Sequence, residues 1–207
     1  MKKLFLCLSI LIAIFSTHTY GILYGNDIKD AFPIGVQKEL DGYLTSGASN
    51  FLLSESQAML LLNEYEISDN GFNIQVSLDY AKKALSLIEV SKTGFLNAKT
   101  LGIKAGVDGQ KAIVLKSVSY DTITTGMNSI VAEKLLKYFK SGDVIGIYSE
   151  NLDNISKIQE TLTYIISILE QGKKPGLDTY WKLYQQYSEA ALFGNYATVI
   201  GRTVFAQ

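Results

Sequence analysis

The sequence predicts an all-α protein built from six or seven helices in antiparallel hairpins. Only two of the 207 residues are proline, so long stretches of the chain are free to be helical. Several stretches place apolar residues three or four positions apart, which is the period of one helix face. Short runs of Ser, Asp, Asn and Gly separate these stretches and supply the turn chemistry that hairpins need.

Two helices are expected in the N-terminal part of the chain. Pro33 can occupy the first turn of a helix that runs to about Leu44, and the loop Thr45-Ser46-Gly47 follows it. The run Ser54-Glu55-Ser56-Gln57 has the capping-box pattern, which predicts that a second helix begins there. The turn residues 68–71 are expected to end this second helix.

The middle of the chain has a less regular pattern. Ser77 is expected to begin a helix whose apolar residues share one face. Residues 94–107 are ambiguous, because their glycines weaken a helix while their threonine and β-branched residues would suit a strand. Residues 110–119 contain an apolar run whose period does not separate helix from strand, and a helix is favoured.

The C-terminal part carries the strongest helical patterns. A helix is expected from Met127 until the turn at residues 141–143. A stripe of apolar residues over 151–171 predicts the best-defined helix, and Gly172 follows in the position where glycine commonly closes a helix. Asp178 is then expected to cap a last helix.

An internal similarity suggests a repeat of about 73 residues. Residues 62–69 align with residues 135–142, and Ser77-Leu78-Asp79 aligns with Asn151-Leu152-Asp153. Two such copies would give stacked hairpins, as in an α/α superhelix or a partial toroid. Chance similarity between helices of like composition is the alternative.

The first residues of the chain have the pattern of a signal peptide. Two lysines precede an apolar run from Leu4 to Phe15, and small residues precede a cut ahead of Ile22. The apolar run is too short to span a bilayer, so no transmembrane anchor is expected in the mature chain. We therefore expect a signal peptide over residues 1–21, a single helical domain over residues 22–207, and a periplasmic or secreted protein.

Export would remove the only cysteine, Cys7, and the only histidine, His18. The mature chain would then lack thiol nucleophiles, histidine-based triads and imidazole ligands for zinc. Its net charge would be about −3, because two of the 19 basic residues leave while all 20 acidic residues stay. We expect no metal, no cofactor and no nucleic-acid partner, and any catalysis would depend on carboxylates.

Glu55 is the strongest catalytic candidate in the sequence. The run Ser54-Glu55-Ser56-Gln57 resembles the start of a helix in (α/α)-barrel glycoside hydrolases, and Tyr120 to Asn128 resembles a helix start in sugar-processing α/α toroids. The first resemblance implies that Glu55 is a general acid. The chain is too short to form a full barrel of this kind. A second carboxylate must then lie about 5–10 Å away, and Asp121 and Asp153 are the candidates. Alternatively, Glu55 only adds negative charge to the first turn of a helix.

The last expected helix is rich in aromatic residues, among them Tyr180, Trp181, Tyr184 and Tyr187. On the surface they would form a ridge that binds a ligand or a protein. In the core they would pack as large groups whose hydroxyls reach the edge, and this alternative is favoured.

Three functions remain open. The favoured one is an exported binding or scaffold protein that presents a groove or an aromatic surface to a protein or glycan partner. The second is a carbohydrate-active enzyme in which Glu55 works with Asp121 or Asp153. The third is a carrier for an apolar small ligand, suggested by the 47% hydrophobic content, which requires an enclosed cavity of about 300 Å³ or more.

Overall fold

The computed structural model describes residues 34–67, 71–104 and 143–204, together with residues 133, 134, 137, 138 and 141. Four long helices dominate these residues: α2 (Ile34–Ile67), α3 (Ile74–Lys104), α6 (Val144–Glu170) and α7 (Leu177–Val204). The predicted all-α class is therefore confirmed. None of the described helices combines the length and the apolar character that crossing a bilayer requires.

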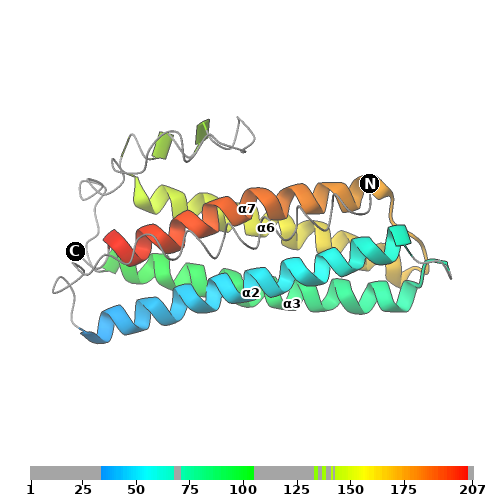
Figure 1. The fold of residues 1–207 in the computed structure, drawn as a ribbon, viewed down its shortest axis with the longest axis horizontal. Coiled ribbons are helices and arrows are strands. Elements are labelled where there is room, and N and C mark those ends of the chain that lie inside the picture. The colour runs from blue at the N-terminus through cyan, green and yellow to red at the C-terminus, as the bar shows by residue number, and fades with distance from the viewer. Residues whose placement is uncertain are drawn as a thin grey trace.

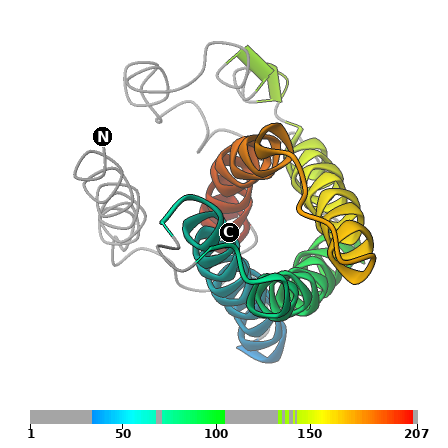
Figure 2. The same cartoon turned by 90° about the vertical axis from the view of Figure 1, so that its right-hand side faces the viewer.

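The four helices form an antiparallel bundle. Helices α2 and α3 make one hairpin, α6 and α7 make the other, and successive helices run in opposite directions (Figure 1). Figure 2 shows the bundle from one end, with each helix between two neighbours. The contact between α2 and α7 is the least extensive of the four.

Two glycines allow α2 and α3 to approach closely. A Cβ atom on Gly94 would lie 2.7 Å from the backbone nitrogen of Gly47, and one on Gly47 would lie 3.0 Å from the ring of Phe95. The hydroxyl of Ser91 also donates to the carbonyl of Gly47 at 2.7 Å. The prediction of a loop at residues 45–47 is therefore wrong. Gly47 serves a contact between two helices, and α2 continues through these residues.

Replacing Gly94 by alanine tests this close approach. We expect Gly94→Ala to lower the free energy of unfolding by about 1–2 kcal/mol, because the added methyl group would force the two backbones apart. Gly42→Ala is the matched control in α2, since its Cβ would meet nothing within 4 Å. The control should gain up to about 1 kcal/mol from helix propensity alone. Equal urea midpoints for the two variants would contradict the close approach.

Ser54 does not begin a helix, so the predicted capping box is also wrong. It lies in the interior of α2, where its hydroxyl donates to the carbonyl of Ala84 on α3 at 2.7 Å. The hydroxyl of Tyr187 on α7 lies 2.5 Å from the hydroxyl oxygen of Ser54. The local pattern misleads here because the serine bonds to neighbouring helices and not to its own first turn.

Helix α3 begins earlier and ends later than the clear part of its pattern. Asn73 caps it, accepting a hydrogen bond from the backbone N–H of Val76 at 3.1 Å, so the helix starts at Ile74 and not at Ser77. The ambiguous residues 94–104 are helical. Residues 105–119, including the predicted helix over 110–119, lie outside the described residues.

Helix α6 also begins before its predicted start at residue 151. Asp143 caps α6 by accepting a hydrogen bond from the backbone N–H of Gly146 at 2.7 Å, so Asp143 marks the start of this helix. Gly172 follows the helix with a φ of 71°, and its N–H bonds to the carbonyl of Leu169 at 2.9 Å, which confirms the predicted closure. Asp178 lies inside the first turn of α7 and does not cap it, because the helix already begins at Leu177.

The structure does not confirm the repeat. Ser77 and Asn151, which were expected to open equivalent helices, both lie buried inside longer helices. Most of the second aligned segment, residues 135–142, lies outside the described residues. Of the helix predicted from Met127, only residues 133, 134, 137 and 138 are described, and all four are helical. Residue 141, which was predicted to lie in the turn that ends this helix, is helical as well.

The core between the four helices combines aliphatic side chains with large aromatic ones. Three tyrosines are almost completely buried: Tyr148, Tyr180 and Tyr187. The hydroxyl of Tyr148 donates to the carbonyl of Ala197 at 2.7 Å, which ties α6 to α7. Polar atoms therefore help to fix how these helices pack, since a buried hydroxyl is costly without a partner.

Candidate functional site

Glu55 lies in α2 on the side that faces α7. It lines a small recess with side chains from both helices: Ala58, Met59, Leu62, Tyr180, Leu183, Tyr184 and Tyr187. The volume of this recess is about 10 Å³. That is room for one water molecule at most, so the recess does not supply a cleft for a sugar.

The apolar surroundings change the acidity of Glu55. Burial raises the pKa of its carboxyl from 4.5 to about 7, because the charged form loses its hydration. No Lys or Arg is among the described residues that line the recess, and burial is the cause of the raised pKa. Burial and the nearby Glu55 charge also raise the pKa of Tyr184. Glu55 is therefore a carboxyl that keeps its proton to a much higher pH than an exposed glutamate does.

The structure does not bring Asp153, one of the two expected carboxylate partners, to Glu55. Asp121 lies outside the described residues. Asp153 is exposed on α6, where its charge acts on Lys134 and Tyr138. Asp153 is not among the residues that line the recess. A pair of carboxyls across a sugar bond is thus not assembled among the described residues at this position.

The aromatic residues of α7 mostly point into the bundle. Tyr180 and Tyr187 are each 1% exposed, so a partner at the surface does not reach them. Tyr184 lines the recess and is partly buried, and the ring of Trp181 meets it edge to face at a centroid distance of 6.0 Å. Packing in the core therefore describes Tyr180 and Tyr187 better than a surface ridge does.

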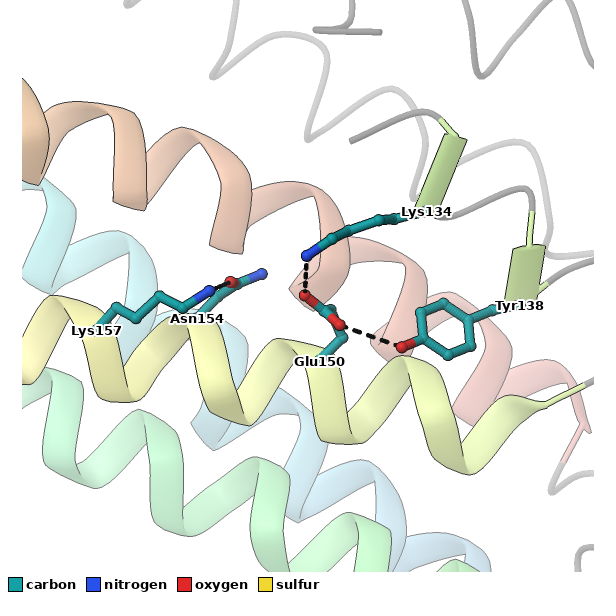
Figure 3. Close-up of polar contacts among 5 residues, drawn as sticks. All are labelled: Lys134, Tyr138, Glu150, Asn154 and Lys157. Atoms are coloured by element: carbon teal, nitrogen blue, oxygen red, sulfur yellow. Dashed lines mark hydrogen bonds and ion pairs between the residues drawn. The ribbon is translucent and has the colours of Figure 1, made fainter. Parts of the chain in front are cut away.

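A second polar cluster surrounds Glu150 on α6 (Figure 3). One carboxylate oxygen of Glu150 accepts from Lys134 Nζ at 2.8 Å, and the other accepts from the hydroxyl of Tyr138 at 3.1 Å. Nearby, Lys157 Nζ donates to Asn154 Oδ1 at 3.0 Å. Burial alone would raise the pKa of Glu150, but Lys134 and Tyr138 outweigh it and lower that pKa.

The Glu150 cluster is an anchor and not a reactive centre. Both oxygens of Glu150 are occupied, so the carboxylate ties residues 134 and 138 to α6. Sequence reasoning missed this cluster because its two charged members lie 16 positions apart and belong to different helices. No group of three or more His, Cys, Asp or Glu side chains in the described ranges is placed to hold a metal ion.

An open groove lies between α3 and α6, on another side of the bundle from Glu55. Its volume is about 620 Å³. We call this surface the α3–α6 groove, and its lining residues are Leu85, Glu89, Lys92, Ser156, Gln159, Glu160, Thr163, Tyr164 and Ser167. Across the groove, Lys92 Nζ donates to Gln159 Oε1 at 2.8 Å.

Sequence reasoning missed this groove as well. Its two walls are about 70 positions apart, and none of its residues forms a local motif. Comparison with known proteins adds no assignment, because no protein-family model, no curated protein and no solved structure is significantly similar to this chain.

Proposed function

We propose that this protein is an exported binding or scaffold protein that holds a protein or glycan partner in the α3–α6 groove. The observation that carries the proposal is the groove itself, an open depression of about 620 Å³ between two helices that presents an exposed aromatic ring beside polar side chains. Its mixture of an aromatic ring, hydroxyls, an amide and charges suits recognition. Export to the periplasm or medium is supported by the signal-peptide pattern of residues 1–21.

The hydroxyls of the groove favour binding over nucleophilic catalysis. Ser156, Thr163 and Ser167 each donate their proton to a backbone carbonyl of α6. A serine or threonine nucleophile instead needs its hydroxyl hydrogen bonded to a base that removes the proton. The described residues of the groove therefore offer contact surface and not an activated nucleophile.

Filling the groove tests the proposal. Thr163→Trp should reduce partner binding by about tenfold or more, because the added ring blocks a central contact. The assay measures retention of protein and of deproteinised glycan from the envelope and medium of the source cells on the immobilised chain. Thr100→Trp is the matched control, because both threonines are exposed and bond to the carbonyl four residues earlier, at 2.8 Å.

The control should bind as the wild type does. Unchanged retention by Thr163→Trp, with its helicity and thermal midpoint intact, would contradict a binding role for the groove. Loss of binding in both tryptophan variants would also contradict it, because the effect would then not depend on the position of the added ring.

A carbohydrate-active enzyme is the second candidate, and one observation favours it. A carboxyl with a pKa of about 7 has the acidity that suits a general acid near neutral pH. Asp121, which lies outside the described residues, would have to act as the partner of Glu55. Hydrolysis of a glycoside by the purified protein, abolished in Glu55→Gln, would support this candidate. The absence of any such activity would remove it.

The carrier for an apolar ligand receives less support. The recess beside Glu55 holds about 10 Å³, far below the roughly 300 Å³ that such a ligand needs. The α3–α6 groove is large enough, but it is open and most of its lining residues are polar.

A further inference from the structure

We infer that the α3–α6 groove recognises a neutral glycan, laid along α6 with its hydroxyls toward the groove floor and one sugar against Tyr164. The inference rests on the proposed function and names the class of ligand for the same site.

The hydroxyl groups of the groove act as acceptors. Ser156 Oγ donates to the carbonyl of Leu152 at 2.8 Å, Thr163 Oγ1 donates to that of Gln159 at 2.8 Å, and Ser167 Oγ donates to that of Tyr164 at 2.7 Å. Each hydroxyl has only one proton, and the helix already uses it. The lone pairs that remain can only accept hydrogen bonds from a ligand.

Two carboxylates add to this excess of acceptors. Glu89 and Glu160 line the groove from opposite walls. The donors are fewer: Lys92 already donates one hydrogen bond to Gln159, whose side-chain amide nitrogen keeps its N–H groups. A ligand that fits this groove therefore brings many donors of its own, as the hydroxyl groups of a sugar chain do.

Tyr164 supplies the apolar part of the site. Its side chain belongs to the groove lining and is 54% exposed, which is high for a large aromatic residue. An aromatic ring gives a flat apolar surface with a polar edge. The C–H face of a sugar ring can pack on that surface while its hydroxyls reach the acceptors beside it.

Charge and shape disfavour other classes of ligand. Glu89 and Glu160 outnumber Lys92, so the groove repels phosphate and sulfate groups. Leu85 is the one aliphatic side chain among the nine lining residues, so the groove offers a peptide a single aliphatic contact beside the ring of Tyr164. A basic peptide would satisfy the carboxylates but not the three hydroxyl acceptors, and it is the alternative to be separated by experiment.

The test uses isothermal titration calorimetry on the purified exported chain. The probes are linear hexasaccharides of glucose, xylose and N-acetylglucosamine, and a lysine-rich peptide of similar length. We expect at least one hexasaccharide to bind. Tyr164→Ala should weaken it by about tenfold or more, whereas Tyr164→Phe should stay within about twofold because the ring remains. The exposure of Tyr164 makes both variants compatible with folding, which circular dichroism and the thermal midpoint verify.

The charge variants separate the two ligand classes. The double variant Glu89→Gln with Glu160→Gln removes the negative charge and keeps one carbonyl acceptor at each position, so peptide binding should be lost while glycan binding should weaken less than peptide binding does. Hexasaccharide binding that is unaffected by Tyr164→Ala would overturn the inference. Peptide binding that Thr163→Trp blocks, without any hexasaccharide binding, would overturn the inference and leave the proposed function standing. If neither probe binds and Thr163→Trp changes no retention of cell-derived partners, both fail.

Discussion

Raising the pH from 4.5 to 8 is expected to destabilise the protein by about 2–3 kcal/mol through Glu55 alone. The carboxyl has a pKa of about 7 in the folded protein and of about 4.5 when unfolded, because folding buries it among apolar groups. Between these values the folded state holds a proton that the unfolded state has released. The stabilising contribution is therefore complete below pH 4.5 and is lost as the pH rises through 7.

The measurement is urea unfolding of the wild type and of Glu55→Gln between pH 4.5 and 8. The glutamine cannot ionise, so the variant should match the wild type near pH 4.5 and exceed it by about 2–3 kcal/mol at pH 8. Glu160→Gln is the control, because Glu160 is exposed on α6 and its variant should keep the pH dependence of the wild type. Parallel pH profiles for the wild type and Glu55→Gln would show that Glu55 is not buried as described.

Ser54→Ala is expected to lower the free energy of unfolding by about 1–3 kcal/mol. The proton of Ser54 goes to the carbonyl of Ala84, so the short contact with Tyr187 must have the tyrosine as donor. The chain of two hydrogen bonds joins α7, α2 and α3. Alanine would remove the acceptor and leave the buried tyrosine hydroxyl without a partner.

A double-mutant cycle with Tyr187→Phe measures this connection. Once the tyrosine hydroxyl is gone, Ser54→Ala should cost less, so the double variant should be more stable than the sum of the single effects predicts, by about 0.5–2 kcal/mol. Strictly additive effects, measured by urea unfolding, would show that the two hydroxyls do not bond.

Local chemistry was enough to predict part of this fold. Gly172 closes α6 as expected because a positive φ depends on the residue itself and its immediate neighbours. Gly47 and Ser54 misled for the opposite reason. Each has a local pattern that predicts a helix boundary, but each serves a contact with a distant segment, so α2 runs through both.

The candidate sites divide in the same way. The sequence drew attention to Glu55, but its raised pKa depends on side chains of α7 that lie more than 120 positions away. The α3–α6 groove gave no signal, because isolated serines and threonines on a helix surface have no pattern of their own. Their common role as acceptors appears only when the helix supplies the carbonyl to which each one donates.

The most direct test of the proposed binding role is a map of the bound surface by nuclear magnetic resonance. Backbone amides of the labelled protein are followed while the best-binding hexasaccharide is added. We expect the largest shifts at residues 85–92 of α3 and 156–167 of α6, which form the two walls of the α3–α6 groove. Shifts confined to the residues around Glu55 and Tyr184, or no shifts at all, would contradict a binding role for the α3–α6 groove.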